Sequence, residues 1–134
     1  MENIIDYFWK SEPQKVKSVL EIYTEKASKG CTQAMMWLVT HYKEQDPNPI
    51  KEYTYRLLVL ENKEPQTFSD YCYNATTNIG LCIFSQPDLT QIYTNVEDHY
   101  LHLNNKPKKD KYHKLILECG NQKQLVNMQI GVKK

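Results

Sequence analysis

Apolar residues recur along most of this chain of 134 residues at steps of three and four positions, which is the periodicity of amphipathic helices. The clearest run is YTEKASKGCTQAMMWLVTHY, residues 23–42. Its small and apolar positions are Tyr23, Ala27, Gly30, Ala34, Leu38 and Tyr42. Gly30 stands where a helix would end in a left-handed cap, and the next helix would begin directly after it. The run predicts an αα-hairpin whose two backbones approach closely at Ala27 and Ala34.

The same periodicity continues along the chain and predicts about eight helices, separated by prolines and short polar clusters. The expected segments are 2–10, 11–29, 31–43, 50–62, 66–78, 89–104, 109–119 and 121–132. The last two would be hinged at Gly120, and the first would cover the end of the first hairpin. Residues 76–84 are apolar and β-branched with a glycine inside, so the pattern leaves them open between helix, short strand and buried turn. The predicted fold class is all-α, built of stacked antiparallel helix pairs.

The spacing within residues 23–42 resembles the Sel1-like branch of the tetratricopeptide repeat superfamily, whose units read roughly Tyr, Ala, Gly, Ala, Leu and Tyr at these steps. Weaker matches follow at Tyr55 and around Gly120, near the repeat length of that family. The resemblance implies a short solenoid of helix hairpins that binds other proteins. An unrelated small helical bundle is the alternative.

Composition agrees with one soluble domain spanning residues 1–134, because 40% of the residues are hydrophobic and 25% are charged. A net charge of +1 gives no overall attraction to nucleic acid or an anionic membrane. No apolar run approaches the ~18 residues of a membrane span, and the N-terminus lacks the pattern of a signal peptide. We therefore expect a cytoplasmic protein that does not bind membranes.

Abundant Tyr, Asn, Lys and Ile suggest an AT-rich genome, such as that of a large DNA virus, in which case the location would be the host cytoplasm or nucleus. The four cysteines, widely spaced and without a Cys-x-x-Cys pair, are expected to be buried thiols.

No catalytic motif or phosphate-binding loop is present in the sequence, so we expect neither enzymatic activity nor a cofactor. His99 and His102 lie three positions apart and could share a metal ion on one helical face. Such a site needs a third ligand, which the surrounding sequence does not clearly supply, so we expect no metal.

Aromatic side chains are the best candidates for contacts with a protein partner, because rigid rings make good anchors for a bound peptide or helix. The candidates are Tyr42, Tyr53, Tyr71 and Tyr73, with packing in the core as the alternative for each. The apolar C-terminal segment 121–132 also suggests self-association as a further hypothesis.

The alternative function is weak binding of nucleic acid through a basic segment, residues 106–114. Its lysines are Lys106, Lys108, Lys109, Lys111 and Lys114. They could neutralise several phosphates while Tyr112 stacks on a base. The opposing interpretation is a solvated loop that leads into a helix.

Overall fold

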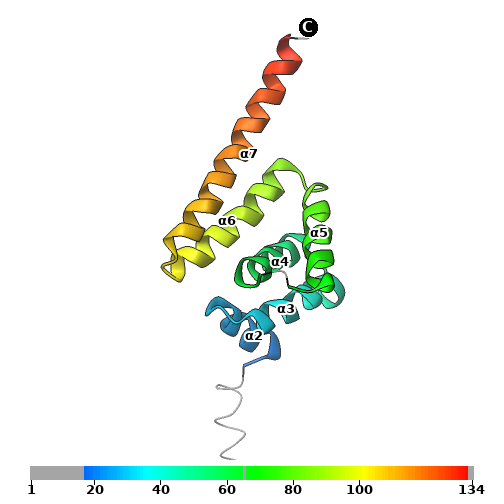
Figure 1. Ribbon diagram of the computed structural model, residues 1–134, viewed down its shortest axis with the longest axis vertical. Coiled ribbons are helices and arrows are strands. Elements are labelled where there is room, and N and C mark those ends of the chain that lie inside the picture. The colour runs from blue at the N-terminus through cyan, green and yellow to red at the C-terminus, as the bar shows by residue number, and fades with distance from the viewer. Residues whose placement is uncertain (1–16, 65, 133–134) are drawn as a thin grey trace, which may run out of the picture.

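The computed structural model describes residues 17–64 and 66–132, with side chains described as far as Cys119. All regular secondary structure within these residues is helical, which confirms the predicted all-α class (Figure 1). The elements are α2 (Val19–Ser28), α3 (Thr32–Thr40), the π-helical turn η1 (His41–Gln45), α4 (Pro49–Asn62), α5 (Phe68–Leu81), α6 (Gln86–His102) and α7 (Lys106–Val132).

The predicted hairpin is present as α2 and α3. Gly30 has a φ of +100°, a backbone conformation that favours glycine, and it reverses the chain between the two helices. Ala27 and Ala34 are each only 1% exposed, since they lie where the helices cross. α2 begins later than the expected segment 11–29, because the Ser18 hydroxyl accepts a hydrogen bond from the Glu21 backbone N–H and caps the helix there.

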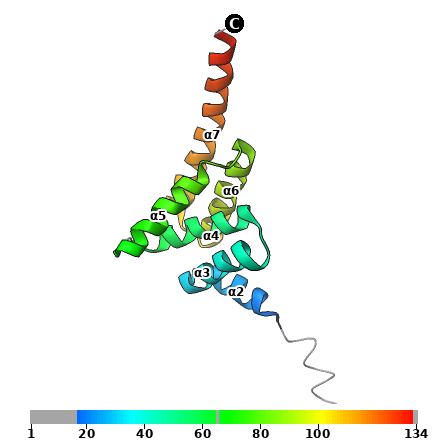
Figure 2. The same ribbon diagram turned by 90° about the vertical axis from the view of Figure 1, so that its right-hand side faces the viewer.

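Helix α4 is the centre of the molecule and packs on α3, α5 and α6 (Figures 1 and 2). Asn48 caps its start, and Pro49 occupies the first turn, where its missing N–H costs nothing. Leu58 on α4 packs with Ile92 and Val96 of α6, all of them buried. The α6–α7 pair is tied to the end of α4, where the Tyr100 hydroxyl donates to Asn62 Oδ1 at 3.1 Å.

Residues 76–84, which the sequence left open between helix, strand and turn, are helical as far as Leu81, where α5 ends. A capping box starts it, in which Thr67 Oγ1 accepts from the Asp70 N–H and an Asp70 carboxylate oxygen accepts from the Thr67 N–H, each at 3.1 Å. The helix then runs through the β-branched stretch to Leu81. The Thr76 hydroxyl donates to the carbonyl oxygen of Cys72, so its polar group is bonded within the helix.

The expectation of eight helices in a tetratricopeptide-type solenoid is wrong. The described residues hold six α-helices and one π-helical turn, and the expected segment 2–10 lies outside them. The expected hinge at Gly120 is absent because this glycine takes helical backbone inside a continuous α7. Successive hairpins also do not stack as repeats, since α4 packs directly on α6 while α5 lies at the edge of the molecule (Figure 1).

Gly80 fixes how closely α5 approaches α4. A Cβ at this position would lie 1.9 Å from the Tyr53 hydroxyl oxygen and 2.4 Å from the adjacent ring carbon, which is too close for any side chain. The Tyr53 ring is itself held by an edge contact with Phe84 at 5.1 Å between centroids. The α4–α5 contact thus requires glycine at this point of the helix.

We predict that Gly80→Ala lowers the free energy of unfolding, although alanine in an unconstrained helix would raise it by about 1 kcal/mol. Overpacking against Tyr53 costs about 1–3 kcal/mol and outweighs that gain. In a Tyr53→Leu background, where the ring is gone, the same substitution should stabilise. Urea denaturation of the four proteins measures both effects, and stabilisation by Gly80→Ala with Tyr53 intact would contradict the close approach.

Candidate functional site

The outer face of α5 gathers the four most exposed large apolar side chains of the described residues. Four side chains are strongly exposed there: Phe68 at 82%, Tyr71 at 60%, Ile79 at 71% and, directly after the helix, Ile83 at 80%. Cys72, Ala75 and Cys82 are exposed between them. In Figure 2, which views the molecule from this side, no described element lies over α5.

These residues form one continuous stripe. At about 100° per residue, positions 68, 71, 72, 75, 79 and 82 fall within an arc of about 100°, with Ala75 in the middle. The opposite side of the same helix is also largely apolar and packs on α4. A helix that is apolar on both sides is normally buried on both sides. In the single chain only one side of α5 is buried.

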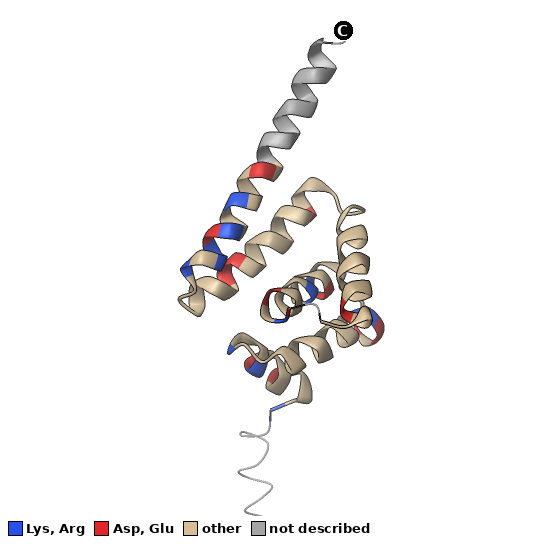
Figure 3. Ribbon diagram, in the orientation of Figure 1, with Lys and Arg blue, Asp and Glu red and all other residues tan. Residues whose placement is uncertain are grey.

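The outer face also lacks charge. No residue from Tyr71 to Pro87 is charged, and the one charged side chain of α5, Asp70, pairs with Lys63 at 2.9 Å. Figure 3 accordingly shows α5 without charged residues beyond its first turn. Solvent-facing helices usually carry charges, whereas the centres of protein interfaces are depleted of them. We define the outer face of α5 by Phe68, Tyr71, Cys72, Ala75, Ile79, Cys82 and Ile83.

The inner side of α5 is positioned by a buried ion pair on α4. Arg56 Nε lies 2.8 Å from Glu52 Oε2, and both side chains are buried. The Arg56 guanidinium also lies 5.2 Å from the ring centroids of Tyr53 and of Tyr73, so a ring of α4 and a ring of α5 share the same cation. This cluster fixes α5 on α4 with its other side turned to solvent.

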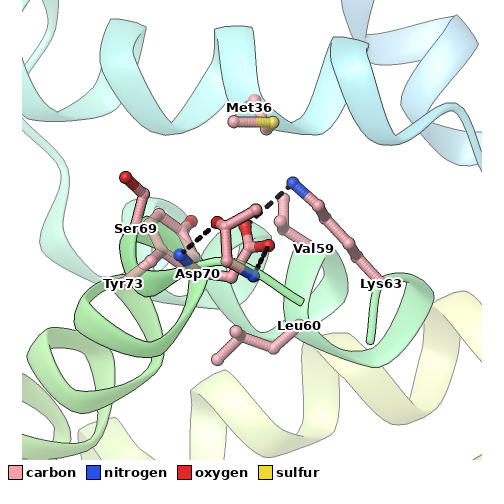
Figure 4. Close-up of a pocket in the computed structure, with 8 residues that line it drawn as sticks. Met36, Val59, Leu60, Lys63, Ser69, Asp70 and Tyr73 are labelled. Atoms are coloured by element: carbon pink, nitrogen blue, oxygen red, sulfur yellow. Dashed lines mark hydrogen bonds and ion pairs between the residues drawn. The ribbon is translucent and has the colours of Figure 1, made fainter. Parts of the chain in front are cut away.

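A cavity of about 330 Å³ lies between α3, α4 and the start of α5 (Figure 4). Met36, Val59 and Leu60 give it apolar walls. Asp70 is its only carboxylate, and the bond from Lys63, together with backbone N–H groups, holds the pKa of this group at about 2. These two charged groups bond to one another, so the cavity offers a ligand mainly apolar contact. It lies on the side of α5 away from the outer face.

The four tyrosines chosen from the sequence do not share a groove. Tyr42 is buried and stacks on Tyr55 with ring centroids 6.2 Å apart. Tyr53 and Tyr73 pack around Arg56, and burial raises the pKa of Tyr73 to about 12. Tyr71 alone lies on the outer face of α5. Three of the four therefore pack within the fold, which was the alternative interpretation.

The structure adds Phe68, Ile79 and Ile83 to the candidate site. The signal was present in the sequence as apolar residues at three- and four-residue steps along a stretch free of charge. Cys72 and Cys82 belong to the same face. The expectation of four buried thiols is wrong, because Cys31, Cys72 and Cys82 are exposed and only Cys119 is buried.

Much of the basic segment is engaged by Glu61, at the end of α4. Lys108 Nζ donates to the Glu61 carbonyl oxygen at 2.6 Å, and Lys111 pairs with the Glu61 carboxylate. The Tyr112 hydroxyl donates to the same carboxylate at 2.8 Å and is buried, so it does not face a base.

Among the remaining lysines of the segment, Lys109 lies 3.8 Å from Asp110. Lys106 and Lys114 are exposed. These contacts leave few lysines to neutralise phosphates, so nucleic-acid binding stays a prediction with less support than the sequence suggested.

His99 and His102 line a second cavity, of about 390 Å³, between α2, α4 and α6. His99 Nε2 is buried without a hydrogen-bond partner, and burial lowers the pKa of this histidine. Across the described part of the chain, no three His, Cys, Asp or Glu side chains come together as a metal site would need.

Comparisons with known proteins add no identity, since no family model, curated protein or solved structure matches this chain. Within residues 17–64 and 66–132, no helix has the length and apolar character needed to cross a bilayer.

We predict that breaking the buried ion pair is costly. Glu52→Gln should lower the free energy of unfolding by about 3 kcal/mol, because it leaves the Arg56 charge buried without its partner. Removing both charges in Glu52→Gln/Arg56→Met should cost less than the single substitution. Chemical denaturation of the three proteins checks this. Equal effects of the single and double substitutions would show that the two charges are not coupled.

We also predict a loss of stability at alkaline pH. Burial raises the pKa of Tyr73 from 10.0 to about 12, and burial also raises the pKa of Tyr100 and of Tyr112. Because the folded protein holds these protons more tightly than the unfolded chain, the stabilisation is complete below pH 10 and falls as the pH rises toward about 12. Tyr73→Phe should make this fall shallower, whereas Tyr71→Phe, at an exposed position, should not change it. Denaturant midpoints measured from pH 8 to 12 test both.

Proposed function

We propose that the protein is a non-enzymatic interaction module that binds an α-helix of a protein partner along the outer face of α5. The observation that supports this is a solvent-facing helix surface that is apolar and free of charge. A partner helix with apolar residues at matching three- and four-residue steps would fill the stripe on either side of Ala75. Each large side chain that leaves water contributes about 1.5–3 kcal/mol.

The polar surroundings support a defined register for such a helix. Asn74 and Asn78 border the stripe on one side, with Asn78 Nδ2 donating to Asn74 Oδ1 at 3.1 Å. Amides at the rim can bond to a partner while the apolar centre stays dry. The rigid anchoring of α5 by Arg56 and Gly80 means that little order has to be gained on binding. An adaptor or scaffold role follows from this kind of surface.

The test compares three tagged proteins in affinity purifications from the native source, with and without nuclease. We expect wild-type protein to recover a stoichiometric protein, resistant to nuclease and to raised salt. Ile79→Lys should lose it, because an ammonium group would be buried without a partner.

Leu101→Lys is the matched control, since Leu101 is 54% exposed on α6, away from the α5 face, and the substitution adds the same charge. It should behave as wild type. Recovery of the same proteins by all three would contradict the proposal. Loss of all recovered material on nuclease treatment would favour the basic segment instead.

A further inference from the structure

We propose that the partner helix is α5 of a second copy of this chain, and that the two α5 helices pair antiparallel about a two-fold axis near Ala75. This rests on the proposed function of the outer face and names its occupant. Three properties of that face support a copy of itself over an unrelated helix. They are its lack of charge, its symmetry about Ala75 and its area.

The first property is electrostatic. In a two-fold dimer the same patch meets itself, so every charge on the patch faces its own sign near the axis. Most protein surfaces therefore resist self-pairing. The outer face of α5 has no charge to repel its copy. The charged residues nearest to it in sequence, Glu64 and Asp70, stand just before and within the first turn of the helix.

The position of those charges also favours the antiparallel arrangement. In a parallel pair, the charged starts of the two helices would meet one another. In an antiparallel pair, each charged start lies beside the uncharged end at residues 82–87 of the other copy. The dipoles of the two helices oppose one another in the same arrangement.

The second property is shape. The smallest side chain of the stripe, Ala75, lies near the middle of α5, and large side chains lie toward both ends. Reversal of the helix about Ala75 brings Phe68 of one copy to Cys82 and Ile83 of the other, and Tyr71 to Ile79. Rings thus pack on aliphatic groups, and the small central residue lets the backbones approach, as Ala27 and Ala34 do in the first hairpin.

The third property is area. A large apolar side chain offers on the order of 150 Å² when fully exposed, so the four large residues at their observed exposures offer roughly 450 Å² per copy. With the smaller side chains between them, two copies would bury roughly 1,000–1,200 Å². That is the lower limit for a specific interface. A reversible dimer is expected, and in Figure 2 no described element lies over α5.

The first experiment measures the mass of the purified full-length chain by sedimentation equilibrium over a series of concentrations. Wild type and Leu101→Lys should approach the mass of two chains as concentration rises. Ile79→Lys should raise the dissociation constant at least about 100-fold, because a two-fold interface contains the substituted residue twice, once in each copy. Circular dichroism shows whether each variant keeps its helical content. A wild-type mass of one chain throughout, or a dimer unaffected by Ile79→Lys, overturns the proposal.

The second experiment tests the arrangement by disulfide formation. In a background with the four native cysteines changed to serine, Ala75→Cys places a thiol next to its own copy across the axis and should cross-link rapidly under mild oxidation. Restoring only Cys72 should give little cross-linking, since reversal about Ala75 separates the two copies of residue 72 along the helix. A parallel pair would cross-link at both positions, so efficient cross-linking through Cys72 overturns the antiparallel arrangement.

The two proposals fail separately. If the purified chain stays monomeric while the affinity purification still recovers a different protein that Ile79→Lys loses, the outer face binds a helix of another protein and only the dimer is refuted. If neither self-association nor a recovered protein depends on Ile79, both are refuted.

Discussion

The buried ion pair between Glu52 and Arg56 is the constraint on which the arrangement of α5 depends. Two charges taken out of water must satisfy one another, and the guanidinium is further surrounded by Tyr53 from α4 and Tyr73 from α5. Gly80 permits the close approach that this packing needs. Together these contacts hold the inner side of α5 against α4. The opposite side of the helix therefore faces solvent.

Glu61, near the C-terminal end of α4, anchors α7, just as Arg56 in the middle of α4 anchors α5. It engages Lys108, Lys111 and Tyr112, so a segment that looks basic in the sequence becomes a structural joint between α4 and α7. Charged side chains thus lie at the contacts of α4 with α5 and with α7, whereas the outer face of α5 carries none.

Much of the candidate site could have been read from the sequence, because apolar residues at three- and four-residue steps run through Phe68, Cys72, Ala75 and Ile79 without an intervening charge after Asp70. The pattern does not predict which side of α5 packs on α4, because both sides of the helix carry apolar residues. The tyrosines were ambiguous for a related reason: an aromatic ring serves equally well in a core or at an interface. The likeness of residues 23–42 to a Sel1-like unit stays a prediction.

The sequence by itself determined the helical class, the first hairpin with its turn at Gly30, and the starts of α3, α4 and α5 to within two residues, because periodicity, glycine conformation and capping act over a few residues. Only the tertiary structure decided that residues 76–81 are helical, that α7 continues through Gly120, and that the hairpins do not stack as repeats. The helical state of residues 76–81 and the packing of the hairpins depend on contacts between residues far apart in the chain, such as Tyr53 with Gly80 and Glu61 with Tyr112. Local pattern carries no information about which distant side chains will meet.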